Sequence, residues 1–162
     1  MNMFRYLHLD KKLSLHWRRY VLQSLYATMA VFLVILLLQL ERVVIIASIG
    51  ASAFIVFAMP QSITAKSRNL IGGHIIGLLV GSLFGLVPQP STLLCAVLYA
   101  LCVGVTIFLM VATDTEHPPA AGTALGVAMI GLSPTLVVSV VTSIMLLALV
   151  HHLLRFRLLD LV

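Results

Sequence analysis

The sequence predicts an all-α integral membrane protein with six membrane segments, two of them short and interrupted by glycine or proline. Hydrophobic residues make up 61% of the chain and charged residues only 9%, whereas an average soluble domain carries roughly 25% charged residues. So few charges could not cover a surface that faces water, so we expect one domain in a lipid bilayer. The ten basic residues outnumber the five acidic ones. They lie at the ends of apolar runs, which indicates membrane topology and not nucleic-acid binding.

Residues 1–19 form a basic segment with interleaved apolar side chains. This pattern predicts a short amphipathic helix on the cytoplasmic membrane surface, attracted by anionic lipid and anchored by Trp17 and Tyr20. A disordered basic tail is the alternative. Because no small-residue cleavage site follows the first apolar run, we expect no cleavable signal peptide.

Two halves of three apolar segments each follow, over residues 20–87 and 91–155. The long segments can cross a hydrocarbon core of about 30 Å. Their expected bounds are Val21–Leu40, Val43–Met59 and Leu70–Val87 in the first half, and Ser91–Ala112, Pro119–Leu132 and Thr135–Leu154 in the second. Charged, polar or proline residues separate them: Glu41 and Arg42, the loop after Pro60, Pro88 and Pro90, and Ser133 and Pro134.

The distribution of basic residues predicts the topology. With six crossings, every lysine and arginine except Arg42 falls on one side of the membrane. If residues 119–132 formed a re-entrant hairpin, Arg155 and Arg157 would move to the opposite side. The positive-inside bias therefore favours six crossings with both termini in the cytoplasm.

The two halves share a pattern that suggests an inverted repeat. Each reads long span, acidic residue followed by a basic or imidazole side chain, short small-residue segment, proline and long span. Three crossings per half would give the halves opposite orientations. Inverted repeats with paired, interrupted segments are typical of transporters whose site lies near the membrane midplane.

A ridge of glycines at four-residue spacing lies in the third segment. Its members are Gly73, Gly77, Gly81 and Gly85. This glycine zipper predicts close backbone contact with another helix. The partner helix can belong to the same chain or to a second subunit. His74 lies beside the ridge, either as a structural histidine bonded to a neighbouring carbonyl or as a lining residue.

The stretch TDTEHPPAAGTALG, residues 113–126, interrupts the apolar sequence of the second half. Pro118 and Pro119 lack a backbone N–H, and the proline at 119 is expected to push residue 118 out of the α region. We interpret both prolines as structural breakers, with a new helix beginning at Pro119. A broken helix in an apolar chain needs protein or a water-filled cavity around its exposed backbone. This stretch is therefore the first candidate for a site.

The sequence EHPPAAGTALG, together with GASAFIVFAMPQSITAKSRNLIGGHIIGLLVG over residues 50–81, resembles the HPP family of small integral membrane proteins. The family takes its name from a motif that matches His117, Pro118 and Pro119 here. It is often described as having four spans, from which the six expected crossings depart. Plant and cyanobacterial members are linked to nitrite transport, so the resemblance implies nitrite as substrate. Because no leader typical of a transit peptide is seen, we expect a prokaryotic plasma membrane.

A small monovalent anion needs donors without a trapped charge, and helix N-termini provide them. We expect two such termini to meet near residues 48–52 and 120–123. The expected pore or substrate-binding residues are Ser48, Gly50, Ser52, His74, His117, Gly122 and Thr123. His117 and His74 would carry a proton or gate the anion. Asp114 and Glu116 would hold the His117 imidazole, form a cytoplasmic vestibule, or lie in a solvated loop.

Three other functional classes stay open. Cation transport could use Asp114 and Glu116, and a scaffold or regulatory protein could bind a partner through the glycine ridge. A metal-dependent hydrolase would need three or four ligands, and the HExxH and GxSxG spacings are absent, so we expect no enzyme, metal or other cofactor. Cys95 and Cys102 are interpreted as packing residues. We expect a homo-oligomer of unspecified number, working as a channel or as a proton-coupled carrier.

Overall fold

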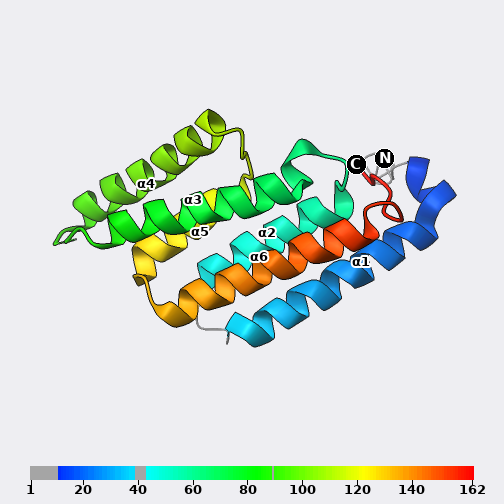
Figure 1. Ribbon diagram of the computed structural model, residues 1–162, viewed down its shortest axis with the longest axis horizontal. Helices are drawn as coiled ribbons and strands as arrows, with labels where there is room; N and C mark the ends of the chain where they lie inside the picture. Colours follow the sequence, from blue (N-terminus) through cyan, green and yellow to red (C-terminus); the bar gives the residue numbers. More distant parts are fainter. Residues whose placement is uncertain (1–10, 39–42, 89) are drawn as a thin grey trace, which may run out of the picture.

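The computed structural model describes residues 11–38, 43–88 and 90–162. They form a bundle of six α-helices that run alternately in opposite directions, so that the start of α1 and the end of α6 lie at the same end (Figure 1). The helices are α1 (Lys11–Leu38), α2 (Val43–Ala58), α3 (Ser67–Gly85), α4 (Thr92–Ala112), α5 (Pro119–Ile130) and α6 (Pro134–Leu154), and the 3-10 helix η2 (Ile63–Ala65) joins α2 to α3. These residues contain no strand, in agreement with the predicted all-α class.

Within the part of the chain that the structure describes, the helices α3, α4 and α6 are long and apolar enough to cross a membrane, whereas α2 and α5 are shorter apolar helices. A multi-pass arrangement follows, with two short segments where the sequence predicts them. The number of crossings and the inverted repeat stay predictions.

Helix α1 consists of two helical pieces that meet at a kink at His16, where the backbone angles are non-helical (φ −127°, ψ 20°) (Figure 1). This break lies a few residues before the expected boundary between a surface helix and a span. The side chains of Trp17, Arg18 and Arg19 are exposed just after this kink. Residues 1–10 of the predicted surface segment, and the pair Glu41 and Arg42, lie outside the described residues.

Side-chain caps and backbone freedom set the ends of the later helices. The hydroxyls of Ser91 and Ser133 accept hydrogen bonds from the backbone N–H groups of Leu94 and Leu136, which satisfies donors in the first turns of α4 and α6. Gly131 ends α5 with a φ of 84°, a conformation that costs glycine little. The proline at 134 then fits the first turn of α6.

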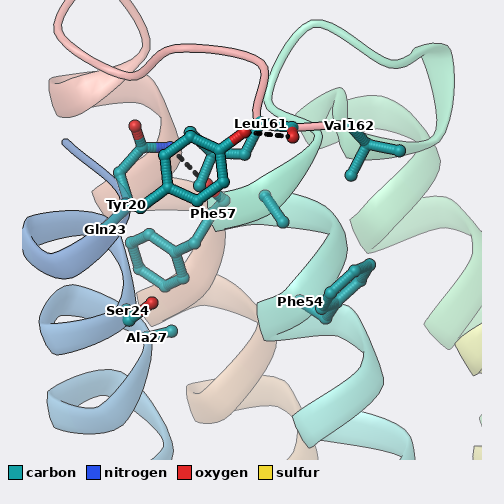
Figure 2. A pocket seen from close by; sticks show the side chains of 9 residues that line it. Tyr20, Gln23, Ser24, Ala27, Phe54, Phe57, Leu161 and Val162 are labelled. Atoms are coloured by element: carbon teal, nitrogen blue, oxygen red, sulfur yellow. Dashed lines mark hydrogen bonds between the residues drawn. The ribbon is translucent and has the colours of Figure 1, made fainter. Parts of the chain in front are cut away.

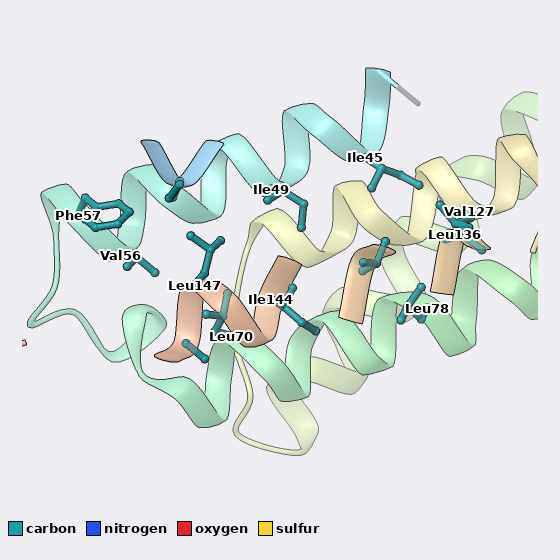
Figure 3. Packing of buried hydrophobic residues seen from close by; sticks show 14 of the residues in the cluster. Ile45, Ile49, Val56, Phe57, Leu70, Leu78, Val127, Leu136, Ile144 and Leu147 are labelled. Carbon is teal, nitrogen blue, oxygen red and sulfur yellow. The ribbon is translucent and has the colours of Figure 1, made fainter. Parts of the chain in front are cut away.

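The main apolar core lies where α2, α3 and α6 meet, with α5 closing one side (Figure 3). Its largest fully buried members are Ile45, Ile49, Phe57, Leu70, Leu136, Ile144 and Leu147. In lipid, the surroundings of a helix are as apolar as this core, so burial alone gives little preference for one partner helix. Close packing and buried polar contacts must then select the arrangement.

The glycine ridge of α3 faces α5 of the same chain. A Cβ at Gly77 would lie 2.5 Å from the Ala120 carbonyl oxygen, and one at Gly73 would lie 2.9 Å from the His117 Cβ. A Cβ at Gly81 would press on the backbone at Ala124. The two helices therefore lie in backbone contact, and this contact fixes the start of α5 against the middle of α3.

The segment after α6 folds back onto α1 and α2 beside an open pocket of about 280 Å³ (Figure 2). The Tyr20 hydroxyl donates to the Leu161 carbonyl at 2.9 Å. The buried Gln23 amide donates to the carbonyls of Phe57 and Leu159 and accepts from the Leu159 N–H. These bonds tie the end of the chain to the same end of the bundle as the α2–α3 connection.

Candidate functional site

A sharp turn between α4 and α5 carries His117 into the bundle. The N–H groups of Ala120 and Ala121 donate to the carbonyls of His117 and Pro118 at 2.9 and 3.2 Å, and α5 begins at Pro119 as predicted. The prediction that residue 118 leaves the α region was wrong, because Pro118 has φ −50° and ψ −39°. A following proline disfavours that region without forbidding it, and the turn that starts α5 holds it there.

Two histidines from different elements meet at Ser52 of α2. The Ser52 Oγ lies 3.0 Å from the His74 Nε2 and 2.9 Å from the His117 Nε2. The two rings have centroids 5.2 Å apart. All three side chains are fully buried.

Two more hydroxyls extend this group toward the start of α5. The His74 Nδ1 lies 2.9 Å from the Thr123 Oγ1, which lies 2.8 Å from the Ser48 Oγ. The Ser48 hydroxyl donates to the Pro119 carbonyl. We call Ser48, Ser52, His74, His117 and Thr123 the polar cluster. Because His74 is seven residues into α3, the cluster lies roughly 10 Å along the helix from its start.

The His117 ring is held by a backbone carbonyl and not by a carboxylate. Its Nδ1 lies 2.8 Å from the Thr64 carbonyl oxygen in η2. The Glu116 carboxylate lies 3.5 Å from the Asn69 amide nitrogen, and the Asp114 carboxylate accepts from Arg68 at 2.9 Å. The suggestion that Asp114 or Glu116 holds the imidazole is therefore not what the structure shows.

Asp114 lies at the surface, where it fastens the turn to the start of α3. Arg68 donates to the Asp114 carboxylate and also to the Thr113 carbonyl at 3.0 Å. The side chains of the pair are 63% and 75% exposed, so solvent screens the attraction and it stabilises little. Asp114 also has a φ of 56°, in the left-handed region that costs most residues free energy.

We expect the backbone at Asp114 to matter more than its charge. Asp114→Ala should lower the free energy of unfolding by about 1 kcal/mol more than Asp114→Gly, because only glycine adopts this φ without cost. Thermal unfolding of the two purified variants in detergent measures the difference. Equal losses in both variants would show that the ion pair with Arg68, and not the backbone, sets the effect.

An apolar groove of about 320 Å³ reaches His117 between α4 and α5. It is lined by Ile107, Met110, Val111, Glu116, His117, Pro118 and Ala121. Among the residues that the structure describes, no three histidine, cysteine, aspartate or glutamate side chains come together as metal ligands.

The structure brings five of the seven expected substrate-binding residues into one cluster. Gly122 lies beside it, since a Cβ there would lie 3.3 Å from the Ser48 Cβ. Gly50 is not part of it, because a Cβ there would meet nothing within 4 Å. The expected meeting of two helix N-termini does not occur: α2 begins at Val43, so Ser48 and Ser52 lie inside the helix.

Four groups at or beside the site, two backbone carbonyls and two side chains, could not be assigned from the sequence. The Thr64 and Pro119 carbonyls are backbone atoms, which no residue type marks. Asn69 and Arg68 belong to the polar loop and first turn before the glycine ridge, and their position at the end of a span was the only signal. Their roles can be assigned only from the structure, in which the first turn of α3 lies beside the turn between α4 and α5.

The fold and the buried polar cluster define a multi-pass α-helical membrane protein. The chain belongs to the HPP family, since the model of the HPP transmembrane region matches residues 12–157. It is similar to two transmembrane proteins of Dictyostelium discoideum, at 40% identity over 54% of this chain and 31% of the relative, and at 36% identity over 52% and 27%. The matched regions thus cover less than a third of the length of either relative. No solved structure matches the chain.

Proposed function

We propose that this protein transports a small monovalent anion across the membrane, with nitrite as the first substrate to test. The polar cluster carries the proposal: ionisable side chains inside a membrane bundle mark ion or proton pathways. His74 and His117 are wholly buried there, on elements that meet at a broken helix. The nitrite assignment comes from the resemblance to the HPP family, and the residues themselves favour only a small anion.

The charges near the cluster favour an anion over a cation. The start of α1, the α2–α3 connection, the start of α3 and the segment after α6 lie at one end of the bundle (Figure 1). They carry six basic residues: Arg18, Arg19, Lys66, Arg68, Arg155 and Arg157. Asp114 is engaged by Arg68, and Glu116 faces Asn69. Cation transport through these carboxylates would require both contacts to break. A positive surface raises the local concentration of anions.

The closed cluster supports a carrier over an open channel. Its hydroxyls bond to one another and to carbonyls, and the N–H groups of Ala120 and Ala121 are already bonded. The groove between α4 and α5 reaches His117, but the side chains of both histidines are fully buried. An anion can therefore contact their Nε2 atoms only if the helices packed around them separate. We propose that α2 and α5 are the paired short segments of an inverted repeat, and that the two halves move against each other.

We also propose that both termini lie in the cytoplasm, in a prokaryotic plasma membrane. The gathering of basic residues at one end of the bundle supports this orientation. With Cys95 and Cys102 replaced by alanine, single cysteines introduced at residue 162 and at residue 132, near opposite ends of α6, test it in intact cells. The variant at 132 should react with an impermeant thiol reagent and the variant at 162 should not, and the reverse result contradicts the orientation.

We also propose that copies of this chain assemble into a homo-oligomer. The ridge glycines face α5 within one chain, so subunits would meet through other surfaces. Helix α4 has the most exposed apolar face of the candidate spans, with Leu93, Leu101 and Phe108 at its surface. Light scattering in detergent measures the mass, and a monomeric mass contradicts this part.

Uptake into proteoliposomes tests transport. We expect saturable nitrite uptake that exceeds uptake of nitrate, chloride and formate and that rises when the outside is made acidic, because a proton enters with the anion. Liposomes without protein and liposomes with a heat-unfolded sample are the controls. Uptake of cations instead of anions would favour cation transport through Asp114 and Glu116. No flux of any ion would remove the transport proposal and leave a scaffold or regulatory role.

A further inference from the structure

The directions of the hydrogen bonds in the polar cluster can be assigned from its two ends. The Pro119 carbonyl can only accept, so the single hydroxyl proton of Ser48 points to it. The Thr123 hydroxyl must then donate to the Ser48 Oγ, because Ser48 has no second proton. With its own proton used, Thr123 can only accept from the His74 Nδ1–H. A neutral His74 therefore has no proton on Nε2.

The same reasoning fixes the second histidine. The Thr64 carbonyl can only accept, so the His117 Nδ1 carries a proton and donates it at 2.8 Å. A neutral His117 also has no proton on Nε2. Both bare nitrogens face one hydroxyl, that of Ser52, at 3.0 and 2.9 Å. The Ser52 hydroxyl is also placed to donate to the Ser48 carbonyl at 3.1 Å, so three acceptors compete for its one proton.

With neutral rings the cluster is thus one proton short. The single hydroxyl proton of Ser52 can leave the Ser48 carbonyl, which keeps its backbone partner inside α2. It can then satisfy only one of the two imidazole nitrogens, so the other buried nitrogen is left without a donor. A buried acceptor without a hydrogen bond is costly. One added proton removes the deficit: one Nε2–H donates to the Ser52 Oγ, and the Ser52 hydroxyl donates to the other Nε2.

We propose that His74, His117 and Ser52 form a binding site for one proton, which passes between the two rings through the Ser52 hydroxyl. In the transfer, the Nε2–H bond of one ring breaks as its proton goes to the Ser52 Oγ, and the Ser52 O–H bond breaks as that proton goes to the Nε2 of the other ring. The positive charge moves from one imidazole to the other and nothing is oxidised or reduced. This inference extends the proposed function. It depends on that function only in the claim that the proton crosses the membrane together with the anion.

A second proton is opposed by the charges around the site. Two imidazolium rings with centroids 5.2 Å apart repel each other. Neither α2 nor α5 carries an ionisable side chain. Glu116 faces Asn69, Arg68 pairs with Asp114 at the surface, and His151 of α6 contacts the Pro60 carbonyl. Further titratable or charged groups on neighbouring elements include Lys66, Cys95, Tyr99 and Cys102 of α4, and His152 of α6. An anion beside the cluster would be the natural partner of the one added charge.

Solid-state ¹⁵N NMR of the histidine-labelled protein in lipid bilayers tests the proton count without measuring transport. Loss of signals in His74→Gln and His117→Asn assigns the two rings. At high pH we expect both to carry their proton on Nδ1 with Nε2 bare. As the pH is lowered from about 8 through the usual histidine range and below it, one Nε2 in the pair should gain a proton. A neutral ring with the proton on Nε2, uptake of two protons, or no uptake would overturn the proposal.

Ser52 variants test the bridge. In Ser52→Ala the added proton should stay on one ring and give two distinct ring signals, whereas Ser52→Thr keeps the hydroxyl and should restore exchange between the rings. If exchange persists in Ser52→Ala with the two rings unchanged in position, the bridge is wrong. These spectra test the proton site independently of transport. If the cluster takes up one proton but the protein moves no anion, the proton site is supported and the proposed transport function is wrong.

Discussion

Replacing His117 by asparagine is expected to lower nitrite uptake by at least about tenfold, which corresponds to ~1.4 kcal/mol. The amide nitrogen of asparagine can take the place of the His117 Nδ1 and donate to the Thr64 carbonyl, so the turn before α5 should keep its anchor. Asparagine has no second nitrogen to reach the Ser52 Oγ and cannot take up a proton near neutral pH. The variant therefore separates the anchoring role of the ring from its protonation.

The alanine variant is the matched comparison. His117→Ala also removes the bond to Thr64 and should cost about 1–3 kcal/mol of stability, because a buried carbonyl loses its donor. Uptake is measured in proteoliposomes per folded protein, at two pH values. If His117→Asn transports at the wild-type rate with an unchanged pH response, His117 is only structural, and His74 becomes the residue to test.

The residue at which α5 begins could be predicted, because two consecutive prolines cannot lie inside a helix but fit its first turn. Pro119 has no N–H to lose in a first helical turn, and the helix begins there in the structure. The segment SIGASA of α2 gave no such constraint. Its small residues sit between β-branched apolar ones without a proline, so the helix runs through them and the serines lie inside it.

The members of the polar cluster were predicted from residue type, but their roles depend on contacts between distant segments. Ser48 and Ser52 share a face of α2 because they are four residues apart. That they face His74, His117 and Thr123 depends on how α2, α3 and α5 pack. The Thr64 carbonyl, which orients His117, lies 53 residues away in sequence. No local pattern indicates such a bond.

The glycine ridge shows the same limit. Spacing of four residues predicts a helix face that allows close approach, and it leaves the partner open. The structure places Gly73 against His117 and Gly77 against Ala120 of the same chain. The ridge thus determines how deep the turn before α5 lies in the bundle, and the site depends on it.

Adding one methyl group to this ridge is therefore expected to have a large effect on the fold. In Gly77→Ala the new Cβ would lie 2.5 Å from the Ala120 carbonyl oxygen, and in Gly81→Ala it would lie 2.9 Å from the Val127 Cβ and 3.0 Å from the Ala124 Cα. The obstructing atoms are mostly backbone, so α3 and α5 must move apart. Overpacking typically costs 1–3 kcal/mol and occasionally more. We expect a fall in melting temperature of ~5 °C or more in each variant.

Glycines at open positions provide the control for these variants. Gly104→Ala in α4 meets nothing within 4 Å, so it should keep or slightly raise stability through helix propensity. Gly85→Ala, with its nearest atom at 3.4 Å, should fall between. Thermal unfolding in one detergent ranks the four variants. If Gly77→Ala and Gly104→Ala melt together, backbone contact between α3 and α5 does not hold the bundle. If Gly77→Ala melts lower, it should also disturb the bond from His74 to Thr123 across the same interface, so stability and the proton site should fail together.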